Sequence, residues 1–302
     1  MGVLKVGVIG AGHMGKIHGK LLQNSNMFDF LGFYDPQVSN LSTEHTFFNS
    51  LNELMDQVEA LSICTSTSAH FELAQFAILG GKHVFIEKPV TQTALEAQKL
   101  VELIGNNSTI GAVGHVERFN PAFTAALPFI SKPQRIEAVR YATQGSRGLD
   151  VSVVLDMMIH DIDLILALIP SPVVSVQARG HRSFTPSCDT AEVQLEFANG
   201  ATALMIASRA HVRKYRSLTV YEQNKTIDLD LLNHSLTIQS WTSPLQDNLS
   251  PSIQPNNAIL DELEDWGNAI LNGSSPKVDL QAGLKNVELA EKIMQSLIYA
   301  VE

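Results

Sequence analysis

The stretch VGVIGAGHMG, residues 6–15, decides the fold, because an apolar strand runs directly into a turn of the pattern Gly-x-Gly-x-x-Gly. Gly10 allows the tight turn, and Gly12 lets the backbone come close to a pyrophosphate. Gly15 lets the next helix pack closely on the strand, and that helix would hold phosphate at its N-terminus. The pattern therefore predicts a strand-turn-helix unit that binds a dinucleotide.

An acidic residue at the end of the next apolar segment supports this interpretation. Asp35 stands 20 residues after Gly15, where a carboxylate can accept hydrogen bonds from both ribose hydroxyls and would repel a 2′-phosphate. The following Pro36 supplies no basic group. The sequence thus favours NAD over NADP, and His13 and Met14, which lie between Gly12 and Gly15, are counted among the cofactor contacts.

The first 115 residues alternate predicted strands with predicted helices. The strands are expected at residues 3–9, 29–34, 60–64, 83–87 and 109–113, and the helices at 14–24, 51–56, 69–80 and 93–105. This alternation is typical of an α/β protein with a doubly wound parallel sheet, the Rossmann arrangement. We therefore predict an NAD-binding Rossmann domain over residues 1–118.

The second half of the chain has a different pattern. Runs rich in β-branched residues occupy 135–142, 172–179, 190–197, 201–208, 216–221, 225–230 and 235–241, and helices are expected at 121–130, 155–168, 257–272 and 282–300. Short turns between the runs favour antiparallel neighbours. Residues 119–302 are therefore predicted to form an α+β domain that binds substrate and mediates oligomerisation. Its open, mostly antiparallel sheet would be covered on one face by the last three helices.

Composition excludes several classes of function. The chain has 302 residues, 45% of them hydrophobic, and a formal net charge of −10, so it offers no basic stripe for nucleic acid. It shows neither a cleavable leader nor an apolar run long enough to span a bilayer, which predicts a cytoplasmic protein with no membrane partner. The two cysteines, Cys64 and Cys188, lack metal-type spacing and are expected to be buried thiols in a reducing compartment.

Four further segments can be considered together with the glycine turn. They are CTSTSAH at 64–70, EKP at 87–89, GHVERFNP at 114–121 and DMMIHDID at 156–163. In this order they resemble the glucose-fructose oxidoreductase and inositol dehydrogenase family, known as Gfo/Idh/MocA, and together they cover nearly the whole chain. The resemblance implies an NAD-dependent dehydrogenase acting on CH–OH groups, assembled as a homodimer or homotetramer by packing sheet against sheet.

Lys88 is the first candidate catalytic residue. It ends the fourth predicted strand, and ligands of open α/β sheets bind outside the carboxyl ends of the strands. An ammonium group there can polarise a carbonyl or stabilise an alkoxide, whereas the alternative is an ordinary surface lysine. Pro89 restricts Lys88 to extended conformations, and the resemblance implies that the peptide bond between them is cis.

Asp156 and His160 are four residues apart in an apolar stretch, so on a helix they share one face. The alternative roles are a helix cap for Asp156 and a buried core histidine for His160. The resemblance implies that His160 is the general base and that Asp156 lies near substrate and lysine, although Lys88 and His160 could exchange roles. Asp161 falls on a different face and Asp163 is given a structural role, so no metal site is predicted.

Further contacts are assigned by the resemblance. It places Thr65, Ser66, His70, Glu87 and Lys88 at the cofactor. For Thr65, Ser66 and His70 the alternative is a local role, in which Thr67 or Ser68 caps the helix that follows. The resemblance places Lys88, Asp156 and His160 at the substrate, and the sequence offers His115, Arg118 and Arg147 as further substrate contacts. A guanidinium suits a nucleotide diphosphate, but Arg118 could instead form an interdomain salt bridge and Arg147 could be exposed to solvent.

Within the family, four segments are most similar to bacterial dehydrogenases that oxidise the 3-hydroxyl of UDP-N-acetylglucosamine. They are residues 114–121, 151–166, 192–209 and 229–238. This likeness implies a UDP-sugar substrate and a downstream aminotransferase that makes a 3-amino sugar for a lipid A-type glycolipid. The alternatives are another sugar, inositol, a dihydrodiol or biliverdin as substrate, and a non-catalytic regulator that binds NAD.

Overall fold

The computed structural model describes residues 2–37, 46–145, 151–241 and 249–299. The chain forms two compact units. Unit 1 consists of Met1–His115 and Asn257–Val287, and unit 2 consists of Val116–Asn256 and Glu288–Glu302. The sequence predicted one boundary, between residues 118 and 119, whereas the chain returns to unit 1 at Asn257 before it enters unit 2 again.

Unit 1 is built on a parallel sheet, as predicted. Its elements are β1 (Leu4–Ile9), α1 (His13–Asn24), β2 (Phe28–Tyr34), α2 (Leu51–Gln57), β3 (Ala60–Ile63), α3 (Thr67–Leu79), β4 (His83–Glu87), α4 (Ala94–Gly105) and β5 (Gly111–Gly114). The strand order among the described residues is β2-β1-β3-β4-β5, with every pair parallel. The order reverses between β1 and β3, and such a switch point is where open α/β sheets bind ligands.

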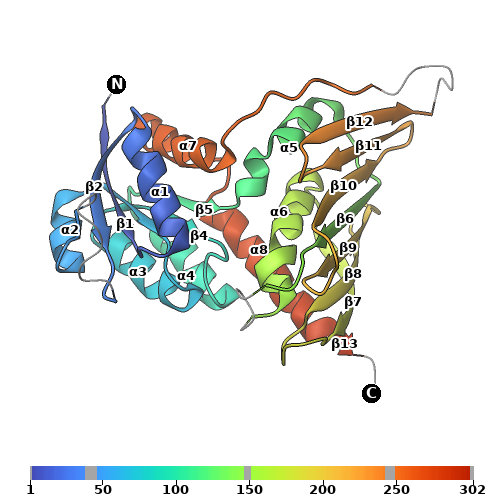
Figure 1. Ribbon diagram of the computed structural model, residues 1–302, viewed down its shortest axis with the longest axis horizontal. Helices are drawn as coiled ribbons and strands as arrows, with labels where there is room; N and C mark the ends of the chain where they lie inside the picture. The colour runs from blue at the N-terminus through green and yellow to red at the C-terminus, as the bar shows by residue number, and fades with distance from the viewer. Residues whose placement is uncertain (1, 38–45, 146–150, 242–248, 300–302) are drawn as a thin grey trace. The chain divides into compact units, whose positions relative to one another are not determined.

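The helix α7 (Ala258–Asn272) belongs to unit 1, where it lies with α1 on one face of the parallel sheet (Figure 1). Its Trp266 is fully buried, stacks on Phe28 with ring centroids 6.2 Å apart and meets Phe85 edge-on at 5.8 Å. The expectation that this helix covers the second sheet was therefore wrong. Periodicity identifies an apolar helix face, but it does not say which sheet that face packs on.

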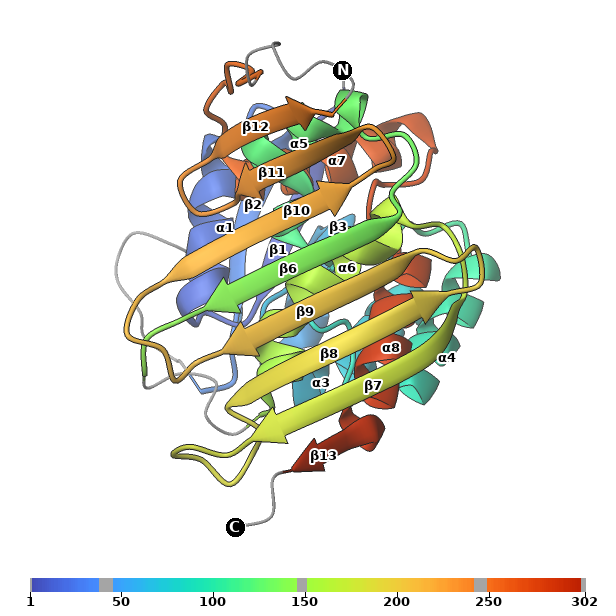
Figure 2. The ribbon, with the colours of Figure 1, turned by 90° about the vertical axis from the view of Figure 1, so that its right-hand side faces the viewer.

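Unit 2 contains a second, larger sheet, which faces the viewer in Figure 2. Its strands are β6 (Arg135–Tyr141), β7 (Val173–His181), β8 (Thr190–Phe197), β9 (Thr202–Ser208), β10 (Tyr215–Tyr221), β11 (Lys225–Asp230), β12 (Ser235–Ser240) and β13 (Leu297–Tyr299). Their order is β12-β11-β10-β6-β9-β8-β7-β13. Only the β6–β9 and β7–β13 pairs are parallel among these strands, so the predicted mostly antiparallel sheet is confirmed.

Helices cover one face of this sheet. They include α5 (Pro121–Ala126) and α6 (Ile159–Leu168), which lie behind it in Figure 2. The 3₁₀ turns Val116–Phe119 and Leu127–Phe129 flank α5, and a π-helical turn, Val154–Met158, precedes α6. In β8 the apolar side chains alternate inward with outward polar ones, which is the pattern of a sheet with one buried face.

The last predicted helix is shorter than expected. The helix α8 (Leu280–Ser296) gives way to β13, which pairs in parallel with β7. Gly180 on β7 makes room for this strand, because a Cβ there would lie 2.8 Å from Tyr299 Cε1. The sequence Leu-Ile-Tyr is compatible with either structure, and the free edge of β7 decides between them. No helix in the described part of the chain has the length and apolar character needed to cross a membrane.

Candidate functional site

The glycine turn between β1 and α1 has the geometry that a pyrophosphate needs. Gly10 adopts φ +93°, a conformation open to glycine. A Cβ on Gly15 would collide with the carbonyl oxygen of Gly10, whereas a Cβ on Gly12 would meet no atom within 4 Å. Gly12 also precedes α1 without a capping hydrogen bond from a described side chain. Open space thus lies in front of the first-turn N–H groups, and the turn fits the diphosphate of NAD.

Asp35 lies against the same turn. Its Oδ2 accepts a hydrogen bond from the N–H of Ala11 at 2.8 Å, and its Oδ1 accepts one from Gln37 at 2.9 Å. Each carboxylate oxygen can accept a second bond, so ribose hydroxyls can still be bound. This placement of a negative charge beside the glycine turn fits NAD and disfavours a 2′-phosphate.

The loops after β3 and β4 are joined by His70. Its Nδ1 lies 2.9 Å from the carbonyl oxygen of Pro89, and its Nε2 lies 3.2 Å from that of Thr65. Burial lowers the pKa of His70, although the carbonyl oxygens of Pro89 and Thr65 act in the opposite direction. His70 is 1% exposed, which gives it a structural contact in addition to its predicted role at the cofactor.

Thr65 and Ser66 follow β3 at the edge of the parallel sheet that carries the glycine turn. Ser66 immediately precedes α3, but its hydroxyl contacts Ser68 Oγ at 3.1 Å and does not cap the helix. The alternative in which Thr67 or Ser68 caps a helix that begins at residue 69 is wrong, because α3 already begins at Thr67. The two side chains remain candidates for cofactor contact.

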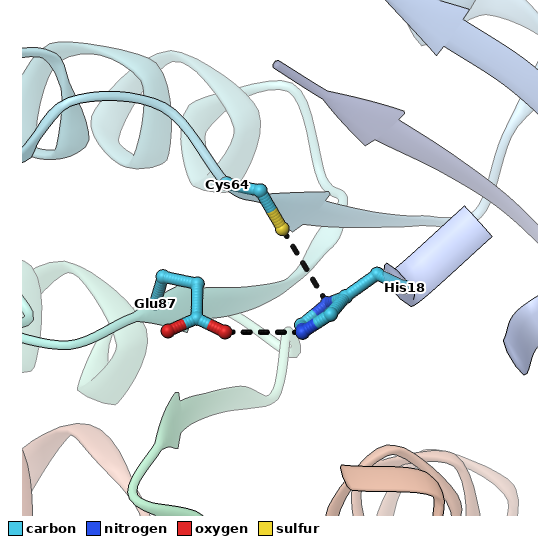
Figure 3. Close-up of side chains that lie close together, drawn as sticks. All are labelled: His18, Cys64 and Glu87. Atoms are coloured by element: carbon cyan, nitrogen blue, oxygen red, sulfur yellow. Dashed lines mark hydrogen bonds and ion pairs between the residues drawn. The ribbon is translucent and has the colours of Figure 1, made fainter. Parts of the chain in front are cut away.

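Lys88 follows the last residue of β4, and the Lys88–Pro89 peptide bond is cis. Its backbone N–H donates to Oε2 of Glu87 at 3.2 Å. The Glu87 side chain is 11% exposed and its Oε1 lies 3.0 Å from Nε2 of His18 (Figure 3). The predicted cofactor residue Glu87 is thus held mainly by protein atoms directly beside the lysine.

His18 was missed at the sequence level. It lies on the buried face of α1 with Gly15, Gly19 and Leu22, and its Nδ1 is 2.8 Å from Ser62 Oγ and 3.4 Å from Cys64 Sγ. A polar residue on a buried helix face needs a partner, and that signal could have singled out His18.

The donor types of His18, Cys64 and Glu87 are also those of metal ligands, and their atoms lie within 4.8 Å of one another in the described structure. Figure 3 shows that the partners face different nitrogens of the imidazole, Cys64 toward Nδ1 and Glu87 toward Nε2. An ion bound by one imidazole nitrogen would therefore not be bound by both partners as they stand. The arrangement fits a buried ion pair better than a metal site.

In unit 2, Asp156 lies on the π-helical turn that leads into α6, and His160 is the second residue of α6 itself. Asp156 is within the π-helical turn, which begins after Val153, and so the alternative of a helix cap is wrong for it. Both side chains are half-buried, whereas Met158 and Ile159 are buried, so they occupy the partly open side of this segment. Single π-helical turns are often found at functional sites, and this one contains a predicted catalytic residue.

The two other acids of this motif are structural. The buried carboxylate of Asp161 accepts three hydrogen bonds from Arg140, at 2.7 to 3.1 Å. Asp163 is also buried and forms an ion pair with Arg118 at 3.4 Å, within unit 2. The structural role expected for Asp163 agrees with this contact.

His115 and Arg147 are also predicted to contact the substrate. His115 is 1% exposed, and its Nε2 contacts Nδ2 of the buried Asn286 at 3.1 Å, both within unit 1. Its described contact therefore connects the end of β5 to α8. Arg147 lies outside the described residues.

Both cysteines, Cys64 and Cys188, are buried and carry free thiols, as expected.

Comparison with known proteins identifies the fold family. A family model described as an oxidoreductase family with an NAD-binding Rossmann fold matches residues 4–115, and the model of the Gfo/Idh/MocA C-terminal domain matches residues 109–228. Together these matches cover most of the chain, including the glycine turn, the loop at Lys88 and the segment with Asp156 and His160.

Individual relatives agree with this result. UDP-N-acetylglucosamine 3-dehydrogenase of Acidithiobacillus ferrooxidans is 32% identical over 279 residues, which is 88% of each chain. Its solved structure superposes with a TM-score of 0.93 over 98% of both chains, at 30% identity. The scyllo-inositol 2-dehydrogenase (NAD(+)) of Bacillus subtilis is 26% identical over 252 residues, 77% of this chain and 73% of the relative. The chain is therefore an NAD-binding oxidoreductase and belongs to the Gfo/Idh/MocA family.

Proposed function

We propose that this oxidoreductase uses NAD to oxidise the 3-hydroxyl of a UDP-sugar, with UDP-N-acetylglucosamine as the first candidate. One observation carries the proposal: the likeness to the Acidithiobacillus enzyme extends over 98% of both chains with a TM-score of 0.93. It is supported by the presence of Lys88, Asp156 and His160, the residue types that the reaction needs.

The proposed chemistry needs one base and one cation. The imidazole of His160 accepts the proton of the sugar 3-hydroxyl, because imidazole titrates near neutral pH. Lys88 stabilises the negative charge that develops on that oxygen, and Asp156 orients the substrate or the lysine. NAD, when bound, takes up the hydride from the sugar carbon, which leaves the 3-keto product. Exchange of roles between Lys88 and His160 remains the alternative assignment.

The cofactor is proposed to be held by residues at the carboxyl edge of the parallel sheet. They are Gly10, Gly12, His13, Met14, Gly15, Asp35, Thr65, Ser66, His70, Glu87 and Lys88. The open space at Gly12 and the carboxylate beside Ala11 support this set. His70 and Glu87 contribute through the loops that they join.

For the substrate diphosphate we propose Arg118 and Arg147. Arg118 is half-buried and its Nη1 contacts Asp163, but a guanidinium has five N–H donors and can bind phosphate as well. His115 is proposed to act on the substrate indirectly, through its buried contact with Asn286.

The test is to incubate the protein with NAD and UDP-N-acetylglucosamine and to follow NADH together with the mass of a keto-sugar. Glutamate and an aminotransferase specific for 3-keto sugar nucleotides pull an unfavourable equilibrium. Controls are NADP, free N-acetylglucosamine and scyllo-inositol, since the uridine diphosphate should supply binding energy. Product only with NAD and the UDP-sugar supports the proposal. Turnover of scyllo-inositol alone would assign a polyol substrate, and NAD binding without any turnover would contradict the proposal and favour the other substrates or a regulator.

We further propose a cytoplasmic homo-oligomer that hands its product to the aminotransferase. The side chains of Val139, Leu204 and Ile206 are half-buried on the face of the unit 2 sheet opposite its core, and a second copy would cover them. Light scattering on the wild type and on Leu204→Glu tests this. A monomeric wild type would contradict it.

A further inference from the structure

We propose that His18 is a positioning residue for Lys88: through a buried ion pair with Glu87 it fixes the backbone at the lysine and keeps the carboxylate from drawing the ammonium group away from the substrate. The inference rests on the catalytic role proposed for Lys88. It concerns a side chain of α1 that does not belong to the recognised motifs.

The geometry makes Glu87 a link between His18 and Lys88. One carboxylate oxygen, Oε1, lies 3.0 Å from Nε2 of His18, and the other, Oε2, accepts the backbone N–H of Lys88 at 3.2 Å. A Cβ on Gly114 of β5 would lie 3.2 Å from the same carboxylate. The carboxylate is therefore confined between α1 and the neighbouring strand, and its two oxygens have different partners.

The other groups around the imidazole fix its orientation. Ser62 Oγ lies 2.8 Å from Nδ1, Cys64 Sγ lies 3.4 Å from the same nitrogen, and Phe85 meets the ring edge-on with centroids 5.4 Å apart. His18 is 0% exposed. With Nδ1 directed at Ser62 and Cys64, the Nε2 edge is left facing Glu87.

The charge state follows from burial and pairing. Burial alone would lower the pKa of His18, but Cys64 and Glu87 raise it well above its usual value. Burial alone would raise the pKa of Glu87, but the charges of His18 and Lys88 lower it. The carboxylate is the permanent anion of the cluster, so the pair is imidazolium with carboxylate. A buried carboxylate that loses its partner is strongly disfavoured.

Lys88 is the other cation that acts on Glu87. If His18 is neutralised, the flexible side chain of Lys88 is the cation that can replace it, because its charge already acts on Glu87. An ammonium group recruited to Glu87 would no longer reach the developing oxyanion. His18 therefore supports turnover without touching the substrate.

The experiment compares His18→Gln, Glu87→Gln and the double variant. His18→Gln should lower kcat on the order of 100-fold with little change in the KM for NAD, as misplacement of a catalytic group does. The double variant should recover most of this loss, because it contains no unpaired carboxylate. A merely structural role predicts the opposite, since the double variant would then be at least as poor as His18→Gln. Ser62→Ala, which removes a neutral partner of His18 Nδ1 but neither ion, is the matched control.

Two measurements need no turnover, so they separate failure of this inference from failure of the proposed function. Acetic anhydride labelling, read by mass spectrometry at Lys88 relative to Lys99, should be slower in His18→Gln and restored in the double variant. If His18→Gln does not fold, ¹⁵N NMR on the wild type and on Glu87→Gln decides: His18 should keep its proton to a higher pH in the wild type than in the variant. Unchanged Lys88 labelling, or a neutral His18 in the wild type, would overturn the inference.

Discussion

Arg140 holds Asp161, the residue directly after His160, through its Nε and Nη2 atoms at 2.7 to 3.1 Å. Its Nη1 donates to Glu117 Oε1 at 2.9 Å. Burial alone would lower the pKa of Arg140, but the carboxylates of Asp161 and Glu117 raise it. One buried guanidinium thus joins β6 to the start of α6 and to the turn that begins unit 2.

Arg140→Met should destabilise unit 2 by about 3–5 kcal/mol, because it leaves the buried Asp161 without its cation and Glu117 with Arg216 alone. The midpoint of urea unfolding measures this. Arg135→Met is the matched control on the same strand, since Arg135 pairs with Glu137 at an exposed position, where an ion pair contributes about 1 kcal/mol or less. Equal shifts in the two variants would contradict the structural role of the Arg140 network.

Within this network Glu117 makes the fold sensitive to acid, whereas burial raises the pKa of Asp161, which acts in the opposite sense. Burial would raise the pKa of Glu117, but Arg140 and Arg216 lower it below the usual 4.5. A carboxylate with a depressed folded-state pKa stabilises the fold above its unfolded pKa, and this contribution is lost as pH falls through the folded value. The free energy of unfolding should therefore decrease below about pH 4.5, and Glu117→Gln should show a shallower decrease. If the free energy of unfolding falls equally with pH in the wild type and in Glu117→Gln, Glu117 is not a source of the acid sensitivity.

The sequence predicted the parallel sheet, the mostly antiparallel second sheet and the glycine turn, because these depend on local periodicity and on glycine positions. It did not place α7 on unit 1, since the choice rests on how Trp266 fits between Phe28 and Phe85. It also missed β13, whose formation depends on the free edge of β7 and the space at Gly180.

For the candidate site, too, the sequence predicted the local motifs but not the contacts between distant segments. The motifs provided Lys88, Asp156 and His160, but not the side chains that support them. His18 approaches Glu87, 69 positions later in the chain, and Arg140 on β6 reaches Asp161 on α6. Such long-range polar contacts leave little local signal beyond a charged or polar residue at a buried position.

His160→Asn should lower kcat by about 10²–10⁴-fold, the usual contribution of a general base. Binding of NAD should persist, because the glycine turn and Asp35 belong to unit 1 whereas His160 belongs to unit 2. Single-turnover kinetics measures the loss of rate, and isothermal titration with NAD shows whether cofactor binding persists. Lys88→Met is the companion variant: if it removes the neutral-pH ionisation from the rate profile and His160→Asn does not, the two residues have exchanged roles.

Asp35→Asn should weaken NAD binding by about 1.5–3 kcal/mol, the range for hydrogen bonds to a charged group. The same change should improve NADP relative to NAD, because the charge that opposes a 2′-phosphate is gone. Asparagine keeps an oxygen that can accept the Ala11 N–H, so the turn should retain its shape and the unfolding midpoint should move little. Titrations with both cofactors measure the ratio of the affinities for NAD and NADP. An unchanged ratio would mean that Asp35 does not discriminate between the cofactors.

Gly12→Ala and Gly15→Ala should separate binding from stability within one turn. Gly12 has φ −71°, which alanine adopts readily, and its added Cβ would meet no protein atom within 4 Å. The free energy of unfolding of that variant should lie within about 1 kcal/mol of the wild-type value. It should bind NAD poorly, since the methyl group occupies the space in front of the helix N-terminus.

The Cβ of Gly15→Ala collides with the carbonyl oxygen of Gly10, so this variant should lose about 1–3 kcal/mol of unfolding free energy through overpacking. Urea unfolding and NAD titration of both proteins test this contrast. Normal NAD affinity in Gly12→Ala would mean that the pyrophosphate does not lie over this turn.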